Sequence, residues 1–336
     1  MVTQVRDLNM RVRKFGTTDL LVSEFGLGCA RLGGIFKRDP AEFVELLRTA
    51  LDGGINFFDT ADIYSQGESE TLLGRAFRGV RDRVVIASKA GYVLPSQRRL
   101  AARMKPFVRP VIRLLGISRR HLPEAVRGSL AQDFSLAHLR RSVEGSLRRL
   151  GTDYLDLFQL HSPPVEVVEP GEWVAGLEEL KAAGKIRYYG VSCDSIEVAS
   201  AVLRHGGVSA LQVPVNLFER DFLSVLPDAK ARGVAVVARE CLANGLLVKN
   251  ISDGDIRSYC QSDGEAQTKA AHLVRFRQLA GERGSALPEL ALRFVNELDG
   301  VSVALVGVSS TTQLDALLSS TIWDRDGRSG DIPNLA

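Results

Sequence analysis

The chain has 336 residues, of which 45% are hydrophobic and 25% charged, and its mean hydropathy is +0.01. These values are typical of a soluble globular protein with a large core, and they exclude the disordered, collagen-like and membrane-spanning classes. The net charge at pH 7 is only +3. This charge is too small for binding to a phosphate backbone to be the main task, so nucleic acid is not an expected partner.

The cysteines and the N-terminus indicate where the protein works. Four cysteines lie far apart, without CxxC pairs or the spacings typical of zinc ligands, so we expect reduced thiols and no metal site. The N-terminal residues 1–13 are polar and basic and lack the apolar run of a signal peptide. No stretch approaches the ~18 apolar residues of a membrane span. These features predict a cytoplasmic protein without stable membrane association.

Short β-rich runs alternate with helical patterns along nearly the whole chain. Residues 10–23 form two apolar-alternating arms around Gly16 and Asp19, which predicts a β-hairpin. The expected strands cover residues 25–28, 55–58, 84–88, 154–160, 188–191, 210–215, 234–238 and 301–306. Apolar stripes predict helices over residues 41–51, 68–77, 139–150, 173–183, 196–204, 222–232, 287–298 and from 312 onward.

Continuous apolar strands that alternate with helices indicate a parallel sheet covered by helices. Eight such units predict an α/β fold of the (β/α)8 TIM-barrel type, with the N-terminal hairpin covering the bottom of the barrel. We expect residues 1–336 to form a single domain of this kind. Two insertions, about 91–135 and about 246–271, follow strands and are expected as long loops on the C-terminal, catalytic face.

Four side chains with chemical potential lie at or just after successive predicted strands. Asp59, Lys89 and His161 end three of these strands, and Tyr64 follows in the loop after Asp59. Each residue alone is commonly structural: a helix cap, a solvated amine, a core imidazole or a packed ring. Because strand ends of a barrel converge on one mouth, their joint occurrence favours a catalytic site.

Such a set supports proton transfer to a carbonyl oxygen while a hydride reaches its carbon. A free tyrosine has a pKa of about 10, and we expect the ammonium of Lys89 to lower the pKa of Tyr64. Asp59 would hold Lys89 in place, and His161 would orient the substrate carbonyl. No side chain donates hydride, so a nicotinamide cofactor is required.

These residues lie in segments that resemble the aldo-keto reductase family. The segment from Gly54 to Tyr64 is similar to its first signature, Ala87 to Lys89 to its lysine strand, and Leu150 to His161 to its histidine strand. The resemblance continues through residues 190–192, 212–216 and 307–313 and covers nearly the entire chain. It implies a (β/α)8 barrel that reduces an aldehyde or ketone with NADPH, in which Tyr64 is the general acid of a tetrad with Asp59, Lys89 and His161.

The resemblance also implies contacts with the cofactor. It assigns Ser192 and Gln212 to the nicotinamide carboxamide and Ser309 and Gln313 to the adenosine end. The alternative is that these polar side chains only satisfy backbone groups. The Arg or Lys that often binds the 2′-phosphate is absent near Ser309, so NADH is the alternative cofactor.

The chain departs from the family pattern beside the expected nicotinamide. Cys193 stands where the family commonly has Asn, and Arg239 replaces an aromatic residue that stacks on the ring. The loop after it, which contributes Leu242, Asn244 and Gly245, contacts the pyrophosphate in relatives. A guanidinium is unfavourable beside the cationic oxidised ring, so we hypothesise that Arg239 favours NADPH over NADP⁺. The alternative is that Arg239 pairs with Glu240 or another acid.

The first insertion contains a basic amphipathic segment, about residues 96–121, without any acidic residue. It is interpreted as a solvated surface helix, a lid over the substrate mouth, or a helix for a membrane surface or partner protein. Two further functions stay open for the whole chain. One is a slow-turnover NADP(H)-binding regulatory or redox-sensing protein on the same fold. The other is a phosphate-binding barrel isomerase, which would not need the pairing of Lys89 with Tyr64.

Overall fold

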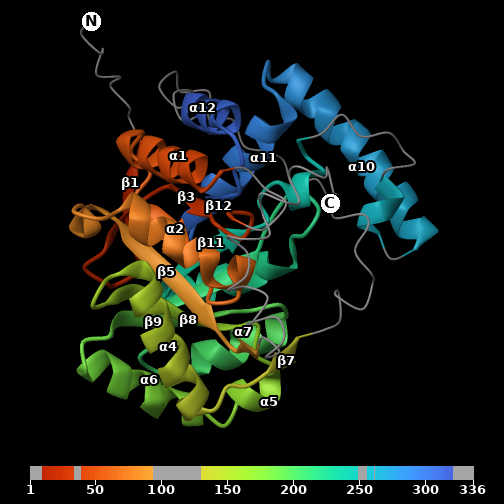
Figure 1. Cartoon of the computed structure of the whole chain (residues 1–336). Coiled ribbons are helices and arrows are strands. Elements are labelled where there is room, and N and C mark those ends of the chain that lie inside the picture. Colours follow the sequence, from red (N-terminus) through yellow and green to blue (C-terminus); the bar gives the residue numbers. More distant parts are fainter. Residues whose placement is uncertain (1–9, 34–38, 94–129, 249–255, 261, 321–336) are drawn as a thin grey trace, which may run out of the picture.

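The computed structural model describes residues 10–33, 39–93, 130–248, 256–260 and 262–320. Parallel strands form a closed eight-stranded barrel, as the sequence predicts (Figure 1). In barrel order starting from the N-terminal strand, they are β3 (Phe25–Gly28), β4 (Phe57–Asp59), β5 (Val85–Ala90), β8 (Leu155–His161), β9 (Ile186–Ser192), β10 (Ala210–Pro214), β11 (Ala235–Arg239) and β12 (Val301–Val306).

Helices surround this barrel and bury one apolar stripe each (Figure 1). In α1, Asp39 accepts a hydrogen bond from the backbone of Ala41 and Pro40 occupies the first turn, which together start the helix. The covering helices are α1 (Pro40–Asp52), α2 (Glu68–Ala76), α4 (Leu136–Leu150), α6 (Glu172–Ala182), α7 (Ile196–Arg204), α8 (Leu226–Ala231), α11 (Leu287–Asn296) and α12 (Thr311–Ser320). The shorter helical turns are η1 (Tyr64–Gly67), η2 (Arg81–Arg83), α5 (Val165–Val168), η5 (Asp221–Val225), η6 (Ala243–Gly245) and η7 (Arg257–Tyr259).

The predicted hairpin is present as β1 (Val12–Lys14) paired with β2 (Leu21–Ser23). Its residues Phe15, Leu20 and Val22 are buried in one cluster with inward residues of the barrel strands, such as Phe57 and Leu157. The hairpin therefore supplies apolar side chains to the interior of the barrel. A functional site is expected at the opposite end, where the barrel strands have their C-terminal ends.

Both predicted insertions contain regular structure at their margins. The antiparallel strands β6 (Tyr92–Val93) and β7 (Ala131–Gln132) pair with each other after β5, and the basic segment 96–121 lies outside the described residues. The second insertion, expected as a loop over 246–271, is shorter than predicted because helix α10 (Asp263–Glu282) starts inside it. Within the described parts of the chain, no helix is long and apolar enough to cross a membrane.

Candidate active site

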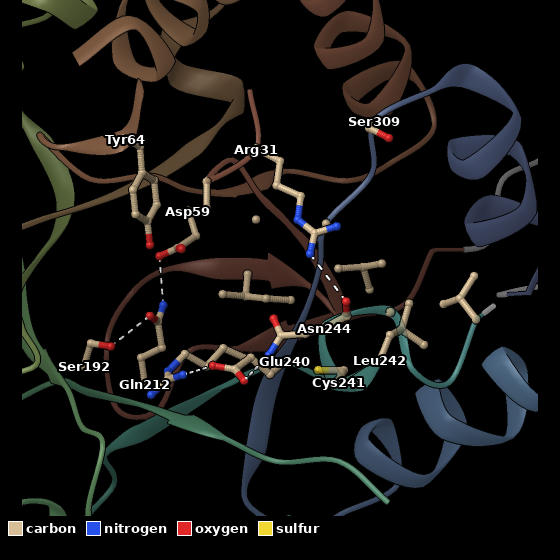
Figure 2. A pocket seen from close by; sticks show the side chains of 18 of the residues that line it. Arg31, Asp59, Tyr64, Ser192, Gln212, Glu240, Cys241, Leu242, Asn244 and Ser309 are labelled. Carbon is tan, nitrogen blue, oxygen red and sulfur yellow. Dashed lines mark hydrogen bonds and ion pairs between the residues drawn. The ribbon is translucent and has the colours of Figure 1, made fainter. Parts of the chain in front are cut away.

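A cavity of about 400 Å³ opens at the C-terminal ends of the barrel strands. Its size lies within the range typical of small-molecule and cofactor sites. Figure 2 shows side chains from distant parts of the chain that point into it. The predicted site residues that line the cavity are Asp59, Tyr64, His161, Ser192, Gln212, Arg239, Leu242, Asn244, Gly245, Ser309 and Gln313.

Lys89 lies behind the cavity wall and is almost fully buried, with 1% of its surface exposed. Its Nζ donates to Asp59 Oδ2 at 2.6 Å and to the backbone oxygen of Thr60 at 2.9 Å. It also lies 3.4 Å from the hydroxyl of Tyr64. The strand register explains this meeting, since Asp59 and Lys89 lie on the adjacent strands β4 and β5. The lysine therefore links a buried carboxylate to the phenol that faces the cavity.

The loop that carries Tyr64 turns through unusual backbone conformations. Ser65 and Gln66 have positive φ angles of 50° and 63°, a region that non-glycine residues rarely adopt, and Gly67 follows at 88°. The hydroxyl of Ser65 donates to the backbone oxygen of Leu32 at 2.6 Å. These contacts hold the tight turn that directs Tyr64 to the barrel mouth.

The electrostatics of Tyr64 correct one expectation from the sequence. Burial raises the pKa of Tyr64 above its usual value, and the nearby charge of Lys89 offsets that rise only in part. Burial is the largest single influence on Lys89 and opposes its charge, but the pKa of Lys89 is raised because the charges and hydrogen bonds of Asp59 and Tyr64 together outweigh the burial. At physiological pH, Tyr64 is therefore a protonated phenol next to a charged ammonium.

His161 completes the predicted tetrad. Its ring meets Tyr64 edge-on with the ring centres 5.7 Å apart, and it meets Tyr92 of β6 edge-on with the ring centres 4.9 Å apart. Burial, together with the charges of Lys89 and Arg239, lowers the pKa of His161 well below its usual value. The imidazole is thus neutral at physiological pH, and its buried Nδ1 has no hydrogen-bond partner among the described residues.

A chain of buried hydrogen bonds joins the two predicted nicotinamide residues to the tetrad. Ser192 donates from Oγ to Gln212 Oε1 at 3.1 Å, and Gln212 donates from Nε2 to Asp59 Oδ1 at 2.8 Å (Figure 2). All three residues are at most 4% exposed. The strand-end polar residues thus form one connected network along the cavity wall.

Arg239, at the end of β11, is held by acids, which is the alternative that the sequence left open. Its Nη1 pairs with Glu240 and its Nη2 with Asp194. The same Nη2 donates to the backbone oxygen of Cys193 at 3.2 Å. Glu240 in turn accepts a hydrogen bond from Asn244 Nδ2 at 2.8 Å, so the pairs fix this loop as well as the guanidinium.

The opposite end of the cavity contains the predicted adenosine residues. The side-chain oxygen of Gln313 accepts hydrogen bonds from the backbone nitrogen of Ser309 at 2.8 Å and from its hydroxyl at 3.1 Å. Arg31, from the loop after β3, lies between this end and Tyr64, and it donates to the backbone oxygen of Asn244 at 3.5 Å (Figure 2). The cavity therefore runs from the end with Asp59, Tyr64 and His161 to the end with Ser309 and Gln313, and the guanidinium of Arg31 lies between them.

The lining residues that were not predicted as cofactor contacts include Asp194 and Ser162. Ser162 directly follows β8 and Asp194 lies two residues after β9, and their positions just past the strand ends were the available signal. Other chemistry is less prominent here. The described residues contain no cluster of three or more metal-ligating side chains. All four cysteines are free, and burial raises the pKa of Cys29, Cys193 and Cys241.

A cofactor with an anionic middle and a polar heterocycle at each end suits this donor set. Neutral hydrogen-bonding side chains lie at both ends of the cavity, and the guanidinium of Arg31 lies between them. Such positive charge along the middle of the cavity complements a pyrophosphate. The residues present therefore fit a nicotinamide dinucleotide.

Comparisons with known proteins agree with the geometry. A sequence profile of the Aldo/keto reductase family matches residues 24–322. An aldo-keto reductase of Bacillus subtilis is 30% identical over 329 residues, which cover 94% of this chain and 89% of the relative. The holo form of an aldo-keto reductase from Bacillus halodurans is 28% identical, with a TM-score of 0.71 and coverage of 93% of this chain and 91% of that one. A Klebsiella pneumoniae aldo/keto reductase in complex with NADP and acetate is 27% identical, with a TM-score of 0.61 and coverage of 89% and 86%.

Proposed function

Because the chain belongs to the aldo/keto reductase family, we propose that it reduces an aldehyde or ketone to an alcohol, with NADPH as cofactor and Tyr64 as general acid. The observation that carries this proposal is the approach of Lys89 Nζ to within 3.4 Å of the Tyr64 hydroxyl, while Asp59 holds the same ammonium at 2.6 Å. The Klebsiella relative that holds NADP supports the choice of cofactor.

The bound nicotinamide supplies the hydride, and the residues of this chain handle the proton and the position of the substrate. Tyr64 gives its phenolic proton to the carbonyl oxygen as negative charge develops there. Lys89 stabilises the phenolate that remains, since its charged amine lies beside that oxygen. Asp59 keeps Lys89 charged and in place, and it costs no reorganisation because the pair is already formed.

His161 orients the carbonyl toward Tyr64. Because its imidazole is neutral, it can donate one N–H to the substrate oxygen without competing for the transferred proton. The edge-on contact with Tyr64 fixes the plane of the imidazole. A small-molecule carbonyl compound is thus the proposed substrate.

The residues along the cavity are assigned to successive parts of the cofactor, from the nicotinamide to the adenosine. We assign Ser192 and Gln212 to the nicotinamide carboxamide, because both are buried polar groups on the wall next to Asp59. The loop with Leu242, Asn244 and Gly245 is assigned to the pyrophosphate. Ser309 and Gln313 are assigned to the adenosine end. We also propose that residues 1–336 form a single barrel domain and that the protein is located in the cytoplasm.

The test compares Tyr64→Phe with Tyr154→Phe on a panel of aldehydes. Tyr154 is a matched control because its ring packs on Arg81, away from the cavity. We expect Tyr64→Phe to lower turnover by a factor of about 10² to 10⁴, with NADPH affinity nearly unchanged, whereas the control keeps its activity. Wild-type turnover in Tyr64→Phe would show that the acid lies elsewhere. Tight NADPH binding by the wild type without appreciable turnover would support the redox-sensing alternative.

A further inference from the structure

The ion-paired group around Arg239 forms part of the cavity wall. The proposed mechanism gives this group no step in proton transfer. Arg239, Asp194 and Glu240 all line the cavity, and both carboxylates contact the same guanidinium. Asp194 comes from the loop after β9 and Glu240 from the loop after β11, so the group joins two loops of the barrel mouth that lie on either side of strand β10.

The charges in this group offset one another. The single positive charge of Arg239 is 21% exposed, whereas its partners Glu240 and Asp194 are 28% and 59% exposed. Water screens the more exposed carboxylates more strongly, so the potential that they produce in the cavity is weaker than that of two fully buried negative charges. The group is therefore close to neutral toward the cavity, although a lone guanidinium at the same position would be positive.

This group lies next to the residues assigned to the nicotinamide. The guanidinium donates to the backbone oxygen of Cys193, which directly follows Ser192. Any net charge here acts differently on the two forms of the cofactor, because the oxidised ring is cationic and the reduced ring is neutral.

We propose that Asp194 and Glu240 neutralise Arg239 and thereby allow the cavity to hold NADP⁺ as well as NADPH. This inference rests on the proposed function, because it requires that the cavity binds the cofactor. It replaces the hypothesis that the positive charge of Arg239 favours NADPH over NADP⁺. Asp194 and Glu240 are in this sense specificity-determining residues for the oxidation state of the cofactor.

The experiment measures the dissociation constants of NADP⁺ and NADPH, by calorimetry and by cofactor fluorescence, without turnover. Asp194→Asn leaves Arg239 with one acid, so we expect NADP⁺ affinity to fall about three- to fivefold relative to NADPH affinity. This loss should shrink in 1 M salt, where charges are screened within about 3 Å. Asp299→Asn is the control, because Asp299 forms a comparable pair with Lys230 just before β12, at the other end of the barrel.

A triple variant decides whether the wild-type group is neutral. Replacing Asp194, Arg239 and Glu240 by Asn, Gln and Gln removes all three charges, and we expect the ratio of the two dissociation constants to stay within about twofold of wild type. A triple variant that gains NADP⁺ affinity more strongly than this would show that Arg239 acts as a free positive charge and would overturn the inference. An unchanged ratio in Asp194→Asn would overturn it as well. If the wild-type chain binds neither nucleotide, the proposed function itself fails.

Discussion

Replacing Lys89 by Met separates the structural role of the buried amine from its proposed catalytic role. The substitution removes the Nζ that contacts Asp59, Thr60 and Tyr64 and fills the space with an apolar chain of similar length. Asp59, at 4% exposure, then keeps a buried charge whose remaining side-chain partner is Gln212. Breaking a buried ion pair from one side costs about 3–5 kcal/mol of unfolding free energy. For a chain of this size, that loss lowers the melting temperature by roughly 5–10 °C.

The double variant Lys89→Met with Asp59→Asn removes both charges. We expect it to recover most of the lost stability, because no uncompensated charge remains, yet to stay as inactive as the single variant. Thermal unfolding followed by circular dichroism gives the stability, and aldehyde reduction gives the activity. Wild-type stability in Lys89→Met would refute the electrostatic reasoning. Wild-type turnover in the double variant would refute the role of Lys89 in proton transfer.

Two further predictions concern pH. Burial raises the pKa of Tyr64 above its ordinary value of 10, so we expect kcat/KM for carbonyl reduction to stay level up to about pH 10 and to fall above it; a fall that begins near pH 8 would mean that Lys89 outweighs burial. Burial, together with the charge of Glu70, raises the pKa of Asp62 from 3.8 to about 7. The folded chain therefore holds a proton that the unfolded chain releases between these values, so this group destabilises the fold as pH rises from about 4 to 7. Asp62→Asn is expected to raise the unfolding free energy at pH 8 by roughly 1–3 kcal/mol and to change it little at pH 4, and denaturant titrations at both values test this.

The barrel was predictable because its strands are short, continuous apolar runs with helical stripes between them. The segment 301–306 is an example: it was expected as a strand and is strand β12. Helix α10 was missed because its apolar residues are sparse. It buries Leu273, Phe276, Leu279 and Ala280 on one side, but charged and small polar residues surround them in the sequence.

The tetrad was predictable in position but not in its electrostatics. Strand ends of a barrel must converge, so Asp59, Lys89 and His161 could be placed together from their order alone. The pKa of Tyr64 depends on how deeply its ring is buried, which no residue pattern states. The pairing of Arg239 with Asp194 also escaped prediction, because the two residues are 45 positions apart and reach each other from strands on either side of β10.

The antiparallel pair β6–β7 has a consequence for the evolution of this enzyme. Backbone hydrogen bonds join Asp133 to Gly91 at 2.8 Å, and Gln132 holds the backbone oxygen of Ser162 at 2.8 Å, so the polypeptide departs and returns at almost the same point. Because the closure entropy of a loop grows only slowly with its length, residues can be inserted or deleted between β6 and β7 with a small change in the free energy of folding. Tyr92, in β6, packs on His161. Evolution can therefore change the length of the chain between β6 and β7 while Asp59, Tyr64, Lys89 and His161 keep their positions.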